Sequence, residues 1–147
     1  MPRRRSVLPM VCCVLILACA GCAVKLIADR DSTTEEHIFA SAERVDLFYA
    51  RLLDIAEDAR PYAAFSTDYL TIEAHLRTLL LRNQVRQLNA DSTKIAETIV
   101  NLWVKYKGMH KEQDTYTTGT ARLDRERFRR LFAYAARAEG AKPPSDN

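Results

Sequence analysis

The sequence predicts an all-α protein, an antiparallel up-down four-helix bundle that follows a cleaved signal peptide. First, four long segments place apolar residues at alternating steps of three and four, as the buried face of a helix does. Second, no segment alternates apolar and polar residues for more than a few positions, which a half-buried strand would do. Third, the links between the helical segments are short, and short links favour antiparallel neighbours.

The first 21 residues have the plan of a secretory signal peptide. Arg3, Arg4 and Arg5 form a cationic block, an uncharged and mostly apolar run follows over residues 7–20, and small residues lead to Cys22. That run holds 14 residues. At about 1.5 Å per helical residue it is too short to cross a hydrocarbon core of about 30 Å. We therefore expect a signal peptide rather than a permanent transmembrane helix.

The residues before Cys22 carry a family resemblance. Ala20-Gly21-Cys22 resembles the end of the lipobox of bacterial lipoprotein precursors, whose usual form is Leu-Ala-Gly-Cys. The resemblance is limited to the first 22 residues. It implies that a diacylglyceryl group is attached to the Cys22 thiol and that cleavage occurs just before Cys22. A fatty acid such as palmitate then acylates the new amino group, and two or more chains give a stable membrane anchor.

The chain departs from the lipobox at one position. Cys19 stands where the family prefers Leu or another aliphatic residue. If Cys19 were the anchor, the preceding residues would be Ile16-Leu17-Ala18, with a bulky Leu17 in the middle, so we favour Cys22. Ala23 rather than Asp follows Cys22. In this family that residue implies sorting to the outer membrane, where the domain would face the periplasm of the cell envelope.

Cysteine usage and charge exclude several kinds of mature protein. All four cysteines lie between Cys12 and Cys22, so the mature domain would contain no disulfide, thiolate metal site or cysteine nucleophile. The whole chain has 22 Lys+Arg and 19 Asp+Glu, a formal charge of +3. Residues 1–21 contain three arginines and no acid, which leaves the mature chain formally neutral. It therefore does not have the basic charge typical of nucleic-acid-binding proteins.

We expect a tether over residues 22–31, the bundle over residues 32–140 and a flexible tail over residues 141–147. The first helix begins at Ser32, with capping-box spacing between Thr33 and Glu36. It is expected to end at Arg60-Pro61, because proline disfavours helix in the residue before it. Its inward positions are predicted to be Ile38, Ala42, Val45, Tyr49, Leu52 and Ala56, widened by Phe39, Phe48 and Leu53.

The other three helices show the same apolar pattern. The second is predicted to begin near Ser66 or Thr67 and to run to about Asn89, and the third follows a cap at Asp91 or Ser92. The fourth follows the longest internal loop, residues 112–119, and runs from about Thr120 to Glu139 with Gly140 as its C-cap. The predicted inward residues of the second helix are Tyr69, Ile72, Leu76 and Leu79, continued by Leu80, Leu81, Val85 and Leu88. Those of the third are Ile95, Ile99, Leu102, Tyr106 and Met109, with Trp103 beside them. Those of the fourth are Leu123, Phe128, Leu131, Phe132, Ala135 and Ala138.

The sequence contains no recognisable catalytic or metal-binding motif. His37, His75 and His110 fall on three helices, and none has a Glu three positions earlier, as a di-iron bundle would require. Most such histidines are surface or helix-end residues. With four glycines in the chain, a backbone cradle for phosphate is hard to build. We expect a non-catalytic protein without a metal or cofactor.

Two basic stretches are candidate partner-binding surfaces. Residues 105–111 contribute Lys105, Lys107 and Lys111, and residues 122–132 contribute Arg122, Arg129 and Arg130. The alternative is a solvated face with local ion pairs, such as Asp124 to Arg127 and Glu126 to Arg130. Aromatic residues near the links offer other contacts: Tyr62, Phe65 and Tyr69 between the first two helices, and Tyr116 in the exposed loop. Phe65 and Tyr69 could instead staple the turn to the core.

These observations predict a lipid-anchored envelope protein that acts by binding, as an adaptor or regulator. Its expected partners are the membrane, through acyl groups on Cys22, and an envelope protein, with no nucleic acid. The alternative is a helical carrier of a small ligand or lipid, which would need a cavity of several hundred Å³ between the helices. An enzyme is the third hypothesis, which a cluster of His37, Glu73 and His75 around one buried cavity would support.

Overall fold

The computed structural model describes residues 25–145, and the regular elements in this part of the chain are all helices. Its four α-helices are α2 (Ser32–Asp54), α3 (Ser66–Gln84), α4 (Ala90–Gln113) and α5 (Thr118–Gly140). Two 3₁₀ turns, η1 (Glu57–Ala59) and η2 (Tyr62–Phe65), join α2 to α3. The predicted all-α bundle is confirmed. The signal peptide and Cys22 lie outside the described residues.

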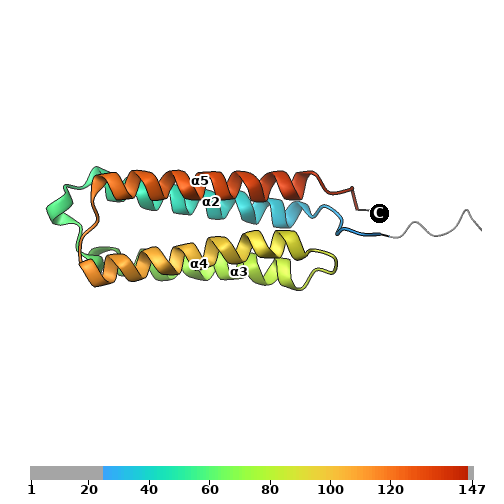
Figure 1. Ribbon diagram of the computed structural model, residues 1–147, viewed down its shortest axis with the longest axis horizontal. Coiled ribbons are helices and arrows are strands. Elements are labelled where there is room, and N and C mark those ends of the chain that lie inside the picture. Colours follow the sequence, from blue (N-terminus) through green and yellow to red (C-terminus); the bar gives the residue numbers. More distant parts are fainter. Residues whose placement is uncertain (1–24, 146–147) are drawn as a thin grey trace, which may run out of the picture.

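The helices pack as two antiparallel pairs (Figure 1). One pair is α2 with α5 and the other is α3 with α4, and contacts between α2 and α3 and between α4 and α5 close the bundle. The chain enters at the same end as the α3–α4 turn and the end of α5; we call it the entry end. The η turns and the α4–α5 loop form the far end.

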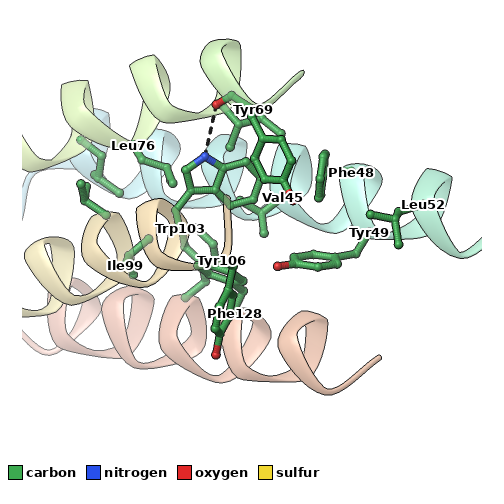
Figure 2. Close-up of a cluster of buried hydrophobic side chains, with 14 of the residues drawn as sticks. Val45, Phe48, Tyr49, Leu52, Tyr69, Leu76, Ile99, Trp103, Tyr106 and Phe128 are labelled. Atoms are coloured by element: carbon green, nitrogen blue, oxygen red, sulfur yellow. Dashed lines mark hydrogen bonds between the residues drawn. The ribbon is translucent and has the colours of Figure 1, made fainter. Parts of the chain in front are cut away.

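An aromatic cluster fills the middle of the bundle (Figure 2). Trp103 of α4 is fully buried, and its ring meets the rings of Phe48, at 5.1 Å between centroids, and Phe128, at 5.8 Å, edge to face. Its indole Nε1–H donates to the carbonyl oxygen of Tyr69 at 3.2 Å, so burial leaves no polar atom of the indole unpaired. Such edge-to-face aromatic contacts add to the stabilisation that burial of the rings provides.

The first helix ends at Asp54, six residues before the predicted end at Arg60-Pro61. Beyond Asp54 the backbone carbonyl groups no longer accept α-helical hydrogen bonds. The buried side chain of Arg60 supplies hydrogen bonds there instead. Its Nε donates to the Ile55 carbonyl oxygen at 2.8 Å, and its Nη1 donates to the Tyr116 carbonyl oxygen at 2.9 Å. Because the side chain of Arg60 provides this cap, the sequence has no proline or glycine at residues 54–56 that would mark the end of the helix. Ala56, predicted as inward, is consequently exposed in the link.

The second helix also ends earlier than predicted, at Gln84 instead of Asn89. Leu88 takes a left-handed backbone conformation, with φ of 56°, and the chain reverses there. Asn89, rather than Asp91 or Ser92, holds the N-cap position of α4. Its amide nitrogen donates to the Asn83 carbonyl oxygen at 3.0 Å, which satisfies the end of α3. Because the turn comes early, Val85 and Leu88 are exposed instead of continuing the apolar stripe.

The last helix and the chain ends differ from the prediction in three ways. Thr117 caps α5, which therefore begins two residues before the predicted Thr120 and includes Gly140. Leu123, predicted as inward, is 49% exposed, and Asp124 is buried in its place. Lys142, in the predicted tail, is buried.

The segments expected as tether and tail are partly fastened to the bundle. The Ala28 backbone N–H donates to the Leu88 carbonyl oxygen at 3.0 Å, and that of Arg30 donates to the Pro143 carbonyl oxygen at 2.8 Å. Within residues 25–145, no helix combines the length and apolar character that a membrane span requires.

Candidate functional site: an apolar groove between two helices

A groove of about 300 Å³ runs between α2 and α5. Buried side chains of both helices, among them Ile38, Val45, Phe128 and Phe132, form its floor. The groove stays open because alanines occupy positions where larger side chains would fill it, at Ala42, Ala133 and Ala136. Phe39 stands at its edge and is 58% exposed. The result is an apolar hollow that remains accessible from solvent.

A charged cluster borders the same groove. Arg125 binds Asp46 with two parallel hydrogen bonds, Nε to Oδ1 and Nη2 to Oδ2, each 2.7 Å long. Arg129 adds a bond from its Nε to Asp46 Oδ1 at 2.8 Å. The hydrogen bonds from Arg125 above all, and from Arg129, hold the pKa of Asp46 well below its usual range. The carboxylate therefore stays charged, and the bidentate geometry fixes the direction of the Arg125 fork.

The structure does not gather the predicted partner-binding cations at one surface. Arg129 turns toward α2 and borders the groove. Lys107 turns the other way, toward α3, where it pairs with Glu73. Lys105, Lys111, Arg122 and Arg130 are exposed, and none of them forms an ion pair with another residue of 25–145.

Local ion pairs account for part of the basic α5 stretch. The predicted pair of Asp124 with Arg127 is confirmed, at 2.9 Å. Glu126, however, pairs with Arg129 at 2.8 Å rather than with Arg130. Arg129 thus serves both a local pair and the inter-helix pair with Asp46. Cys22, the predicted lipidation site, lies outside the described residues.

A second concentration of polar groups lies inside the far end of the bundle. His110, expected at a surface or helix end, is buried there. Its Nε2–H donates to the Arg60 carbonyl oxygen at 2.9 Å, so its Nδ1 accepts from the Tyr69 hydroxyl at 3.0 Å. Burial lowers the pKa of His110 and raises the pKa of the Tyr69 phenol. Both groups are accordingly neutral at pH 7.

A tyrosine pair and an aspartate continue this interior network. The Tyr116 hydroxyl donates to Asp124 Oδ2 at 2.6 Å and lies 3.4 Å from the Tyr49 hydroxyl. Tyr116, predicted as an exposed loop residue, is therefore a buried core residue. Burial raises the pKa of Tyr49 and of Tyr116. The adjoining hollow measures about 30 Å³, roughly the share of one water molecule in the liquid. These hydrogen bonds join α2, the α4–α5 loop and α5, and they leave little room for a substrate.

The other polar candidates do not form a site. Glu73 is bound to Arg77 and to Lys107, both on the α3–α4 side of the bundle. Within residues 25–145, no three His, Cys, Asp or Glu side chains come together as metal ligands would. Phe65 and Tyr69 are buried, as the staple interpretation of that link predicts.

Sequence reasoning did not find the groove. The helical pattern assigns Phe39 and Ala42 to the core side of α2, but it cannot show that the space beside them is unfilled. The available signal is the run of small residues toward the end of α5, Ala133, Ala135, Ala136 and Ala138, on a helix otherwise rich in large side chains.

No protein-family model matches the chain, and no curated protein and no solved structure matches it.

Proposed function

We propose that this chain is a lipid-anchored protein of the bacterial cell envelope that binds another envelope protein, as an adaptor or regulator without catalytic activity. The anchor is Cys22, on the resemblance of Ala20-Gly21-Cys22 to a lipobox. The observation that carries the binding function is the open apolar groove between α2 and α5, with its fixed charged border.

The groove suits a helical segment of a partner. Its two walls are parallel ridges of helical side chains, and an amphipathic helix can lay its apolar face between such ridges. Arg129 and Glu43 are exposed beside the apolar floor, as expected of the polar rim around an interface core. Phe39 would supply a large aromatic contact at the edge, and aromatic residues, phenylalanine included, are enriched at protein–protein interfaces.

The second candidate is a carrier of a small apolar ligand or an acyl chain. It is favoured by the surface exposed within the groove, which is almost entirely apolar, and by a volume at the lower end of the range for ligand pockets. The middle of the bundle offers no comparable room, because Trp103, Phe48 and Phe128 fill it. A carrier would therefore have to bind its ligand in a surface groove such as this one.

Site-specific photocrosslinking of the full-length protein in cells tests the proposal. A photoreactive residue replaces Phe39 in the groove or, as a control, Leu70, which is 63% exposed on α3 and lies outside the groove. We expect one dominant protein adduct from position 39, little from position 70, and loss of the adduct with Cys22→Ser. Lipid or small-molecule adducts at position 39 would instead favour the carrier.

A groove-filling variant sharpens the same experiment. Ala133→Trp places a large ring in the groove from an exposed position, while Ala74→Trp adds the same ring to an exposed position of α3. The adduct should be lost in the first variant and kept in the second. An adduct that survives Ala133→Trp would show that the partner binds elsewhere and would contradict the proposal.

A further inference from the structure

Four exposed apolar side chains gather at the entry end of the bundle. Leu26 is 81% exposed, Ile27 45%, Val85 72% and Leu88 52%. We call this set the entry patch. Its members come from two segments far apart in the sequence, the chain entry and the α3–α4 turn, which lie at one end of the molecule (Figure 1). Exposed apolar clusters of this kind are uncommon unless they contact something.

Hydrogen bonds hold the two segments of the entry patch together. The Ala28 N–H donates to the carbonyl oxygen of Leu88 at 3.0 Å. This bond joins the residue that follows Ile27 to a patch residue of the turn. Arg86, in the turn, donates from Nη1 and Nη2 to the Glu139 carboxylate at 3.1 and 3.0 Å. The Asp31 N–H donates to the same carboxylate at 2.8 Å. The patch is therefore a fixed surface rather than a set of independent side chains.

The cations around the patch are already paired. Lys25 binds Asp29, Arg30 binds Glu35, and Arg82 binds Asp31. Arg86 and Lys142 share the buried carboxylate of Glu139. These five cations are paired with four carboxylates, so the entry end keeps little net positive charge to attract anionic headgroups. What it offers is apolar contact.

The distance to the anchor identifies what covers the patch. Cys22 precedes Lys25, the first described residue, by three positions, and three extended residues span at most about 11 Å. An acylated Cys22 in a bilayer would thus hold the entry end against the membrane surface. The far end cannot reach that surface at the same time in an upright bundle, because α2 has 23 residues and a length of about 35 Å.

We propose that the entry patch inserts into the surface of the bilayer that carries the Cys22 acyl chains. This inference rests on the proposed lipid anchoring. Insertion sets the bundle upright on the membrane, with the η turns and the α4–α5 loop directed away from it. The α2–α5 groove then stands along the side of the bundle, open to a partner in the aqueous space. The contact is apolar, so it needs neither anionic lipid nor low salt.

Fluorescence quenching on vesicles tests this orientation. The full-length protein is purified as the processed lipoprotein, and mass spectrometry establishes acylation of Cys22. It is reconstituted into vesicles of phosphatidylcholine, an uncharged lipid, that contain a lipid-borne quencher. With Cys22 acylated and cleavage before it, an introduced cysteine is the only free thiol. Gln87→Cys labels the entry end and Ala63→Cys the far end, both at exposed positions.

We expect strong quenching of the label at position 87 and little at position 63, unchanged at high salt. The variant Leu26→Ser with Leu88→Asn should lose most of the quenching at position 87 while it stays membrane-bound. Asn suits the left-handed backbone of residue 88, so the turn should survive. The control is Leu47→Ser with Leu70→Ser, at exposed apolar positions of α2 and α3, which should change nothing.

Each other outcome has a definite meaning. Equal quenching at positions 87 and 63 in an acylated protein overturns the entry-patch proposal and leaves the anchor intact. Quenching that disappears at high salt also overturns it, since the contact would then be electrostatic. A mature protein without acyl groups on Cys22 overturns the anchoring itself, and the patch proposal falls with it.

Discussion

At the scale of single residues, His110 makes the stability of the fold sensitive to acid. Its ring is buried, its Nε2–H is committed to the Arg60 carbonyl oxygen, and burial lowers its pKa. In the unfolded chain the imidazole would titrate near pH 6.5. Below that pH the unfolded state binds a proton that the folded state does not, so acidification favours unfolding.

The free energy of unfolding should therefore fall between pH 7.5 and pH 5.5, by up to about 1.4 kcal/mol from this one residue. Urea unfolding, followed by the fluorescence of the single tryptophan, measures the change. His110→Gln should flatten this pH dependence even if it lowers the stability at both pH values. His37→Gln serves as the control at a less buried position. The same pH dependence in His110→Gln as in the wild type would contradict the assignment.

Tyr116 stabilises the fold through its hydroxyl group. Its hydroxyl donates to the carboxylate of Asp124, which is 1% exposed. Tyr116→Phe keeps the ring and removes this donor, and a hydrogen bond to a charged group contributes about 1.5–3 kcal/mol. We expect the free energy of unfolding to fall by about 2 kcal/mol. Tyr134→Phe, at a residue that is 59% exposed, should change it by less than about 0.5 kcal/mol. Equal effects of the two substitutions would show that the interior bond is not stabilising.

At the scale of helices, apolar spacing predicted the four elements, but their ends depended on contacts between distant residues. The stripe of Tyr69, Ile72, Leu76 and Leu79 is buried as predicted. The end of α2 was misplaced because Arg60 reaches back to Ile55 and across to Tyr116, a pairing that spacing does not encode. Asp124 took the place of Leu123 because Tyr116 and Arg127 satisfy its carboxylate.

The candidate site was harder to predict than the helices that form it. Arg129 was a candidate partner-binding residue, and the structure places it at the groove. Its role depends on Asp46, which is 83 positions away. Arg125 carried no signal when each helix was considered alone, and the alanines of α5 indicate small residues without showing that the space beside them is open. A groove is a property of how two helices pack, so periodicity along one helix does not reveal it.

Gly108 is a weak point within α4. It is exposed, lies well inside the helix, and an added Cβ would meet no atom within 4 Å. Glycine in a helix interior costs about 1 kcal/mol relative to alanine, since it loses more backbone freedom on folding. Gly108→Ala should therefore raise the free energy of unfolding by about that amount. Gly140→Ala, at the last residue of α5, should have a smaller effect. Thermal unfolding compares the two, and a loss of stability in Gly108→Ala would contradict the prediction.

At the scale of the whole molecule, Glu139 joins three separate parts of the chain. Its carboxylate accepts from the Asp31 backbone N–H, from Arg86 in the α3–α4 turn and from Lys142 after α5. Burial alone would raise the pKa of Glu139, but the hydrogen bonds from Arg86 and Lys142 lower it instead. The entry end therefore depends on one buried carboxylate that remains charged.

Glu139→Gln removes the charge while keeping the shape of the side chain. Lys142 and Arg86 would then be buried or half-buried without a full counter-charge, and breaking a buried pair in this way costs about 3–5 kcal/mol. We expect a loss toward the lower end of that range, because the amide oxygen can still accept a hydrogen bond. Glu126→Gln, which breaks an exposed pair with Arg129, should cost less than about 1 kcal/mol.

Hydrogen exchange should show where the Glu139→Gln variant opens. The amides of Ala28 and Arg30, which donate to Leu88 and Pro143, should lose protection first. The amide of Trp103, in the middle of the bundle, should lose only as much as the global change in stability requires. A uniform loss at all three amides would mean that the entry end unfolds together with the core. Selective loss would mean that Glu139 holds the entry end, and with it the relative position of Leu26 and Leu88.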